Sequence, residues 1–127
     1  MQEKITQLSP ENLSSRQLAL SIAAAADDRK AADILILSVT EVSYLADYFV
    51  IVTGFSRAQV RAISQAIDDK LEQTWQRHPL RVEGQNQASW ILKDYGDVIV
   101  HIMLPEERDF YNLEAFWSHA TKIDFPQ

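Results

Sequence analysis

The sequence predicts a single α/β domain, built as one mixed sheet of about five strands with helices packed against it. Two observations support this class. Continuous apolar runs of strand length alternate with segments in which apolar residues recur every three or four positions. The chain has 127 residues and 46% of them are hydrophobic, which fits the size and core content of one domain. No internal repeat is present.

The N-terminal part predicts an arm followed by a helix. Residues 1–13 are mostly polar and are interpreted as the arm, so the domain is expected to occupy residues 14–127. The helix is expected to begin at Ser14, a good N-cap, with Gln17 as its capping-box partner. Small and apolar residues at helical spacing continue it to about residues 28–30.

The first strands are predicted at residues 32–39, which contain the continuous apolar run 34–37, and at residues 48–52, which are apolar throughout. Because such runs need cover on both faces, both strands are expected inside the sheet. A long helix is then expected after Ser56, another good N-cap, and Gln59 stands at its capping-box position. The pair His78-Pro79 is expected to end this helix, since proline cannot continue it.

The C-terminal part predicts three strands and a helical stretch. A short strand is expected at residues 81–83. Strands at residues 90–95 and 98–104 are separated by Gly96-Asp97, which is typical of a β-hairpin. Pro105 and the two glutamates after it suit a helix N-terminus, so a final helical stretch is expected there.

The charge balance limits the kinds of partner. With 12 basic and 18 acidic residues the formal net charge is −6, which argues against gripping a phosphate backbone with a basic face. A basic protein partner fits, although many acidic domains need their charge for solubility alone. The absence of cysteine excludes disulfides, thiolate catalysis and cysteine-bound zinc. Without a signal sequence or an apolar stretch of about 18 residues, the protein is expected to be cytoplasmic.

The candidate catalytic side chains do not form a recognisable set. The histidines have no metal-ligand spacing, and His101, in a nearly all-apolar strand, is interpreted first as a buried structural histidine and only then as a binding residue. Asp97 lies four positions before it, so a regular strand would direct both to one face, where Ser56 could complete a Ser-His-Asp set. No Gly-x-Ser-x-Gly elbow supports that set. We therefore expect no metal, no cofactor and no enzymatic activity.

Nucleotide chemistry has only weak signals. Residues 53–56, Thr-Gly-Phe-Ser, end a strand and open a helix, where backbone N–H groups can hold a phosphate. The segment lacks the other glycines of a dinucleotide fingerprint and the Gly-Lys-Ser/Thr of a P-loop, which favours a simple turn with a serine cap. Metal-dependent nucleotidyl transfer needs carboxylates that converge at a strand end, and no Asp-x-Asp occurs on a predicted strand.

Aromatic residues concentrate in the C-terminal third of the chain. Six of them lie within 28 positions: Trp90, Tyr95, Phe110, Tyr111, Phe116 and Trp117. Acidic residues surround them: Asp94, Asp97, Glu106, Glu107, Asp109 and Glu114. Tryptophan and tyrosine are favoured interface anchors, and an acidic rim suits a basic partner surface. Each of these aromatic residues could equally complete a small core.

An ordered series of motifs resembles a known family. The segment Asp47-Tyr48-Phe49-Val50-Ile51-Val52-Thr53-Gly54-x-Ser56 resembles the central motif of the ribosomal silencing factor family, also called Iojap-like. Later residues agree in order and spacing: Glu83-Gly84, Trp90, Asp94, Gly96-Asp97-Val98-Ile99-Val100-His101, Arg108, Tyr111, Leu113-Glu114 and Trp117. The resemblance covers residues 15–117, most of the chain. The ordered series is specific, whereas a single Thr-Gly-x-Ser is not.

The resemblance implies a fold and a function. The fold is a nucleotidyltransferase-like α/β domain that lacks the catalytic carboxylates. The function is that of a homodimer that binds ribosomal protein number fourteen of the large ribosomal subunit and blocks subunit joining when nutrients are short. We expect no membrane contact and no direct DNA binding. Two alternatives stay open: a nucleotide-binding enzyme that uses residues 53–56, and a large-subunit assembly factor with the same contact.

Carried over by position, the resemblance also implies a partner-binding surface. Its seven residues are Trp90, Asp94, Asp97, His101, Arg108, Tyr111 and Glu114. Trp90 is the expected apolar anchor, and Asp94 and Asp97 are the expected partners of basic side chains. Arg108 could instead pair with an acid inside the chain. One departure is Gln59, which stands where the family commonly has histidine, although glutamine can still serve the capping box.

Overall fold

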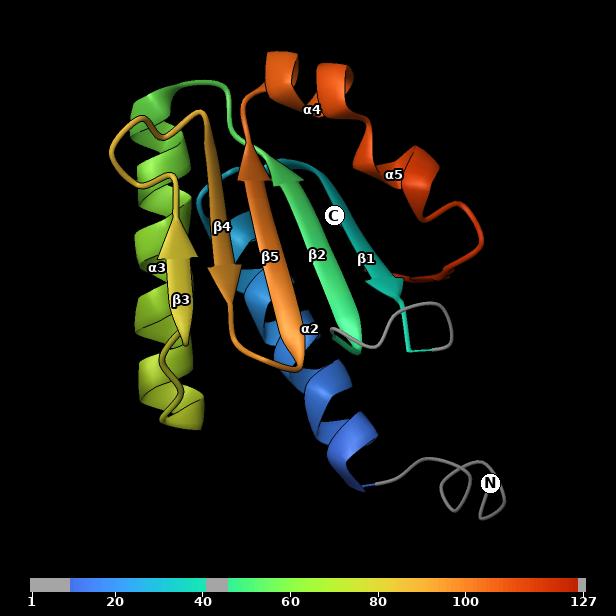
Figure 1. Cartoon of the computed structure of the whole chain (residues 1–127). Coiled ribbons are helices and arrows are strands. Elements are labelled where there is room, and N and C mark those ends of the chain that lie inside the picture. The colour runs from blue at the N-terminus through green and yellow to red at the C-terminus, as the bar shows by residue number, and fades with distance from the viewer. Residues whose placement is uncertain (1–9, 41–45, 126–127) are drawn as a thin grey trace.

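Figure 1 shows the computed structural model, which describes residues 10–40 and 46–125. One mixed sheet forms its centre, with strand order β3-β4-β5-β2-β1-β6. The long helices α2 and α3 lie against one face, and the short helices α4 and α5 lie over part of the other. In chain order the elements are α2 (Pro10–Asp28), β1 (Ala32–Ser38), β2 (Tyr48–Thr53), α3 (Arg57–Trp75), β3 (Arg81–Glu83), β4 (Trp90–Asp94), β5 (Val98–Met103), α4 (Pro105–Tyr111), α5 (Leu113–Phe116) and β6 (Thr121–Ile123).

The centre of the sheet is a parallel pair of strands, β2 and β5. Tyr48 pairs with Val98 at one end of this ladder and Thr53 pairs with Met103 at the other. The other neighbouring strands of the described sheet pair antiparallel. Every residue of β2 is buried, and β1 lies between β2 and β6. The expectation that both N-terminal strands lie inside the sheet is therefore confirmed.

The expected number of five strands is one too few. β6 forms a sixth strand, which pairs antiparallel with residues 36–38 of β1. It has three residues, and its first two are exposed. Such a segment has neither the length nor the apolar alternation by which a strand is recognised in a sequence. Its pairing with β1, and not its own composition, makes it a strand.

The first helix begins earlier than expected. α2 starts at Pro10, so Ser14 lies inside the helix instead of at its N-cap. Proline is common at the first helical position, because the N–H group that it lacks has no intrahelical partner there. Residues 10–13 of the expected arm are therefore helical, and residues 1–9 lie outside the described chain. The helix ends at Asp28, as expected.

The long helix and the hairpin follow their predictions. Ser56 is the N-cap of α3, and its hydroxyl accepts a hydrogen bond from the backbone N–H of Gln59. The helix ends at Trp75, slightly before the expected His-Pro pair, where Gln76 takes the left-handed conformation with φ 51°. β4 and β5 form the predicted antiparallel hairpin.

The final helical stretch is divided in two. α4 begins at Pro105, as expected, with Glu106 and Glu107 in its first turn. Asn112 separates α4 from α5 and has a left-handed backbone with φ 45°. Asparagine tolerates this conformation better than most residues, so it can end one helix and turn the chain into the next.

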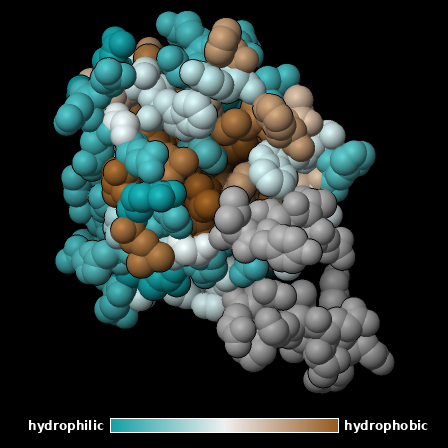
Figure 2. Space-filling view, viewed as in Figure 1, coloured by the Kyte–Doolittle hydropathy of each residue, from teal (hydrophilic) through white to brown (hydrophobic). Residues whose placement is uncertain are grey.

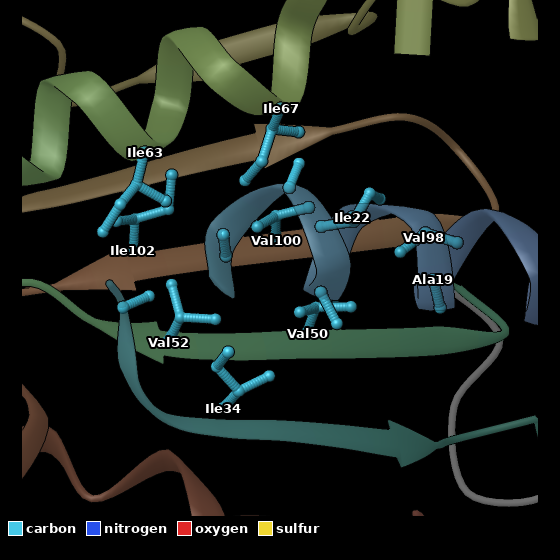
Figure 3. Close-up of a cluster of buried hydrophobic side chains, with 14 of the residues drawn as sticks. Ala19, Ile22, Ile34, Val50, Val52, Ile63, Ile67, Val98, Val100 and Ile102 are labelled. Carbon is cyan, nitrogen blue, oxygen red and sulfur yellow. The ribbon is translucent and has the colours of Figure 1, made fainter. Parts of the chain in front are cut away.

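The main hydrophobic core lies between the sheet and the two long helices (Figure 3). The strands contribute mostly β-branched side chains: Ile34, Val50, Val52, Val98, Val100 and Ile102. Ile63 and Ile67 of α3 and Ile22 of α2 pack onto them. Several alanines of α2, Ala23 and Ala26 among them, are also fully buried, which lets this helix lie close to the sheet. Each buried isoleucine contributes about 1.5–3 kcal/mol to folding.

One charged side chain is buried in this core. Lys93 of β4 has 0% side-chain exposure, and its Nζ lies 2.6 Å from Asp68 Oδ1 and 2.9 Å from Ser64 Oγ, both on α3. Burial lowers the pKa of Lys93, while the hydrogen bond and the charge of Asp68 act in the opposite direction. The Tyr95 hydroxyl donates to the same Asp68 oxygen, and burial raises the pKa of Tyr95. Tyr95 therefore belongs to the core. The contacts of Lys93 and Tyr95 with Asp68 connect β4 and the turn after it to α3.

Candidate functional site

The face of the sheet opposite α2 and α3 carries an aromatic and apolar surface. Strand alternation brings together Phe49 and Ile51 of β2, Trp90 and Leu92 of β4, and Ile99, His101 and Met103 of β5. We call these seven residues the aromatic face. Leu113, Trp117 and Ala120 of the C-terminal segment cover part of it. Figure 2, viewed from this side, shows hydrophobic atoms gathered over the sheet with hydrophilic atoms around them.

Six rings form an unbroken series across the aromatic face and the C-terminal segment. In order they are Trp117, Phe49, His101, Trp90, Tyr111 and Phe110, with centroid separations of 4.9, 5.6, 5.8, 4.7 and 4.9 Å. Aromatic pairs are favourable at such distances when the rings are tilted or edge-on, as here. From Phe49 onward exposure rises along the series, from 5% at Phe49 to 45% at Tyr111 and 80% at Phe110, whereas Trp117 before it is partly buried. The middle of the series is therefore core, and its Phe110 end meets solvent.

His101 lies buried within this series, as interpreted from its strand. Its Nδ1 accepts a hydrogen bond from Trp90 Nε1 at 3.1 Å, so the proton of the neutral ring lies on Nε2. Burial lowers the pKa of His101 to about 4, which keeps the ring neutral at pH 7. The neutral ring can accept this hydrogen bond, whereas the protonated ring cannot. His101 therefore fixes the orientation of the Trp90 indole.

Arg108 of α4 lies beside the aromatic face and is paired inside the chain. Its Nε donates to Glu114 Oε2 at 3.2 Å, and its Nη1 donates to Thr53 Oγ1 at 2.9 Å. These contacts join α4, α5 and the end of β2. The other carboxylate oxygen, Glu114 Oε1, is buried and has no hydrogen-bond partner within residues 10–40 and 46–125. The Glu114 side chain as a whole is 36% exposed, so its accessible part lies elsewhere than at Oε1.

The two predicted aspartates lie away from this group. Along β4, Trp90 pairs with Met103 and Asp94 pairs with Ile99. Four residues of strand separate Trp90 from Asp94, which corresponds to about 13 Å. Asp94 Oδ1 accepts a hydrogen bond from the Gly96 N–H in the hairpin turn. The structure therefore brings Trp90, His101, Arg108, Tyr111 and Glu114 together and leaves Asp94 and Asp97 at the other end of the hairpin.

The expectation that Asp97 and His101 share a face is wrong. Asp97 precedes β5 and lies in the turn, where the chain is not a regular strand. Its carboxylate accepts hydrogen bonds from Ser15 of α2 at 2.8 Å and from Arg77 at 2.7 Å. Burial raises its pKa, but these bonds and the Arg77 charge outweigh that effect and lower the pKa of Asp97. Since Ser56 caps α3, the Ser-His-Asp set does not assemble.

The turn between β2 and α3 uses its polar groups internally. The Gly54 N–H donates to the Met103 carbonyl at 3.0 Å, and the Phe55 N–H donates to Gln59 Oε1 at 2.8 Å. A Cβ added to Gly54 would lie 2.9 Å from Val60 Cγ2, so the turn packs tightly onto α3. The N–H groups of Gly54 and Phe55 are therefore already occupied. This favours the interpretation of residues 53–56 as a capped turn.

Gln59, which departs from the family pattern, links two helices. Its Nε2 donates to the carbonyls of Arg29 and Lys30 at 3.1 Å each, just after the end of α2. Its Oε1 reaches the Phe55 N–H, one residue before the Ser56 cap that a regular capping box would use. One amide therefore ties the end of α2 to the beginning of α3.

Three other observations concern the described residues. Within 10–40 and 46–125, no three His, Asp or Glu side chains form a group that could hold a metal ion. In the same ranges, no helix combines the length and the apolar character needed to cross a membrane. Three of the five exposed large hydrophobic side chains there, Phe110, Tyr111 and Phe116, lie in α4 and α5 beside the aromatic face.

Sequence reasoning missed Phe49 as a member of the site. Phe49 lies in a continuous apolar run, which indicates a core residue and gives no reason to choose one face. The parallel register pairs Phe49 with Ile99 and Ile51 with His101. That pairing could have placed Phe49 on the face of His101, had the neighbouring strand been known.

The fold and the site define a small α/β domain whose most distinctive surface is a sheet face of clustered aromatic rings. Surfaces of this kind are typical of protein interfaces. The chain belongs to the ribosomal silencing factor family, because the model of that family, described as ribosomal silencing factor during starvation, matches residues 12–127. The family resemblance of the sequence is thereby confirmed.

Individual relatives agree with this assignment. A ribosomal silencing factor of Bacillus subtilis is 44% identical over 106 residues, which are 83% of this chain and 89% of that protein. The chloroplastic Iojap protein of Zea mays is 44% identical over 108 residues, 85% of this chain and 46% of that protein. The chain thus spans about half the length of the maize protein.

A solved structure agrees with the fold. The crystal structure of a protein from Chromobacterium violaceum matches with a TM-score of 0.75 and 33% sequence identity, over 91% of this chain and 92% of that chain. The mixed α/β sheet flanked by helices is therefore the architecture of a related protein as well.

Proposed function

We propose that the protein is a translation repressor that acts by binding and not by catalysis. It binds the large ribosomal subunit through ribosomal protein number fourteen and covers the surface that faces the small subunit. The bound protein thereby blocks subunit joining sterically. This block operates in the cytoplasm when nutrients are limiting. The similar protein of Bacillus subtilis is itself named a ribosomal silencing factor, which supports this function.

The observation that carries the proposal is the aromatic face. Trp90 is partly exposed, its indole is oriented by His101, and its ring contacts Tyr111. Tryptophan and tyrosine supply much of the binding free energy in protein interfaces, above all when they are held rigidly before binding. A partner that covers Trp90 would also cover Leu92 and Ile99, which are partly exposed on the same face.

Local charge supports a basic partner. Glu106 and Asp109 are exposed on α4, and the Glu114 side chain is 36% exposed. Basic side chains of a ribosomal protein can pair with these carboxylates. We assign direct contact to four of the seven carried-over residues, Trp90, Tyr111, Glu114 and Asp94, and a positioning role to His101, Arg108 and Asp97.

Replacement of the anchor tests this proposal. We expect Trp90→Ala to weaken binding to large subunits by about 2 kcal/mol or more, roughly thirtyfold. Co-sedimentation titrations with purified large subunits measure the affinity. Trp75→Ala is the matched control, because Trp75 is also partly buried but lies against α2, where its Nε1 donates to Ser21. A folded Trp90→Ala variant with unchanged affinity would show that the aromatic face is not the contact.

Titrations with mature and with precursor large subunits, together with an assay of subunit joining, separate repression from an assembly role with the same contact. Under the proposal the protein binds mature large subunits and inhibits their joining to small subunits in a purified system. Preferential binding to precursor particles, without inhibition of joining, would favour the assembly factor.

The enzyme alternative has its own test. The proposal includes a nucleotidyltransferase-like fold that has lost its catalytic carboxylates. Because the N–H groups of Gly54 and Phe55 already have partners, we expect no saturable binding of nucleoside triphosphates with magnesium in calorimetry. Tight, saturable binding would favour an enzyme.

We also propose that the protein is a homodimer. The exposed rings of Phe110 and Phe116 are suited to a subunit contact, since large apolar side chains gain by burial. Light scattering should then give twice the mass of the 14.5 kDa chain. A mass equal to one chain at micromolar concentration would contradict the dimer.

A further inference from the structure

A surface without acidic residues adjoins the aromatic face. Residues 54–67 and 84–93 contain no aspartate or glutamate, although the whole chain has 18 acidic residues. The first segment leads into and forms the first half of α3, and the second comprises the β3–β4 loop and most of β4. Figure 1 shows this loop beside the first turns of α3. The net charge of −6 is therefore unevenly distributed over the molecule.

Two arginines of the first segment bind backbone carbonyls of the second segment, and the positive charges of these arginines are not neutralised by a carboxylate of the described residues. Arg57 Nε donates to the Gln87 carbonyl at 2.9 Å, and Arg61 Nη2 donates to the Asn86 carbonyl at 2.8 Å. Both side chains are exposed, and neither forms an ion pair with a carboxylate of the described residues. A carbonyl carries no net charge, so the two guanidinium charges remain for a ligand. Each guanidinium also has further N–H donors.

The acids that border this surface have their own partners. Glu83 lies 3.1 Å from Arg81, and Asp68 is bound by the buried Lys93. Gly84 separates Glu83 from the loop and has a backbone with φ 86°. A Cβ at Gly84 would lie 2.0 Å from the Trp90 carbonyl oxygen, so the loop is closely packed against the beginning of β4. The acid-free surface is thereby held next to the proposed anchor.

The polar groups on this surface suit nucleic acid. The loop adds the exposed neutral amides of Gln85, Asn86 and Gln87, and Phe55, 63% exposed, precedes Arg57 in the chain. Guanidinium groups bind phosphates with strong, directional hydrogen bonds. Amides bond phosphate and sugar oxygens, and exposed aromatic rings stack on unpaired bases.

We propose that this surface, formed by Phe55, Arg57, Arg61, Gln85, Asn86 and Gln87, binds the sugar–phosphate backbone of RNA on the large ribosomal subunit. The inference rests on the proposed function, which brings the aromatic face against a ribosomal protein and this neighbouring surface against the adjacent RNA. Overall net charge does not oppose the contact, because charges farther away than about 10 Å are largely screened at cellular salt.

The salt dependence of binding tests the charge contribution. The double variant Arg57→Gln/Arg61→Gln should bind large subunits more weakly than the unchanged protein, with the largest difference at low salt. Removal of two phosphate contacts should lower the slope of log affinity against log salt by about 1.5–2. The ratio of the affinity of the unchanged protein to that of the double variant should then fall roughly tenfold between about 50 and about 200 mM salt.

A second pair of variants keeps the arginine contacts intact. Gln85→Glu/Gln87→Glu leaves the backbone carbonyl that Arg57 binds and adds two negative charges to the surface. We expect it to weaken subunit binding roughly tenfold at low salt. Its matched control, Gln17→Glu/Gln73→Glu, changes the net charge equally at exposed positions on α2 and α3 outside the surface, and should bind as the unchanged protein does.

Binding to isolated ribosomal protein number fourteen distinguishes RNA from that protein as the ligand of this surface. Loss of affinity for the subunit, with unchanged affinity for the isolated protein, supports the inference. Equal loss on both would assign the surface to a protein contact and overturn it, as would unchanged subunit binding by folded variants. If Trp90→Ala weakens subunit binding but the arginine and glutamine variants do not, the proposed RNA contact is wrong and the proposed function is still supported. If the unchanged protein does not bind subunits, the proposed function itself fails.

Discussion

The two faces of the sheet differ in composition and in cover. Towards α2 and α3 the strands present valine and isoleucine, and two helices of 19 residues each cover them. The aromatic face is covered in part by α4 and α5, in which no residue is buried. Consecutive residues of one strand, such as Val100 and His101, therefore serve different faces. We infer that the helix-covered face contributes most of the stability, whereas the aromatic face remains partly in solvent and is the face that we propose for binding.

The largest effect on stability is expected at the helix-covered face. Ile67→Ala removes a side chain that is 0% exposed, and we expect the free energy of unfolding to fall by about 4 kcal/mol. Denaturant titration measures this change. The affinity of the folded fraction for large subunits should remain the same. If folded Ile67→Ala lost as much affinity for large subunits as Trp90→Ala, the assignment of stability to one face and of binding to the other would be wrong.

The buried ion pair should come next. Asp68→Ala leaves the Lys93 charge without its carboxylate in the core, which should cost about 3 kcal/mol of unfolding free energy. In the double variant Asp68→Leu/Lys93→Met no charge is left buried, so most of that loss should be recovered. If single and double variants are equally destabilised in denaturant titration, the pair contributes by packing and not by charge.

On the aromatic face, acid should reduce stability through His101. Its pKa is lowered to about 4 in the folded chain, against 6.5 for the ordinary side chain, so the unfolded chain takes up the proton first as the pH falls. The neutral, buried His101 ring thus contributes to stability. This contribution is complete above pH 6.5 and is lost as the pH falls through about 4, which lowers the free energy of unfolding by about 3 kcal/mol in total. Unfolding titrations across this range measure it.

His101→Gln provides the control for that titration. It removes the titrating ring, so its stability should fall less between pH 6.5 and pH 4 than that of the unchanged protein. The pKa of Asp97 is also lowered, so its protonation destabilises the protein on acidification. Asp97 is present in both proteins, and its effect therefore does not distinguish them. Parallel pH profiles for the two proteins would mean that His101 is not the group responsible.

The smallest effect on stability is expected at the exposed rings. Phe116 is 78% exposed in the single chain, so Phe116→Ser should change the free energy of unfolding of the monomer by no more than about 0.5 kcal/mol. Thermal unfolding at a protein concentration too low for the proposed dimer measures this. A loss of several kcal/mol would show that α5 contributes to the core as the long helices do.

Much of the fold could be predicted because its strands are strongly patterned. The all-apolar run of β2 and the Gly-Asp turn between β4 and β5 identify those elements without knowledge of their neighbours. β6 could not be found, since only its pairing with β1 defines it. The early start of α2 was missed because Ser14 is a good cap by itself, although Pro10 also suits a helix start.

The candidate site was predicted less completely, because it depends on geometry between strands. Trp90 is the predicted anchor and Tyr111 another residue of the predicted surface, and the two rings are in contact. Spacing alone suggested that Asp97 and His101 share a face, but the turn directs Asp97 to Ser15 and Arg77. The unneutralised charge of Arg57 could not be recognised from composition, since the overall excess of acids conceals it.

The parallel pairing of β2 with β5 has a consequence for how the molecule is made. Each residue of β2 pairs with the residue fifty positions later in the chain. Contacts so distant in sequence form slowly, because a long loop must close before any of them is gained. A nascent chain cannot complete its central strands before Met103 has been synthesised, nor the ring series before Trp117. The surface proposed to meet the ribosome therefore does not exist while most of the domain is still being made.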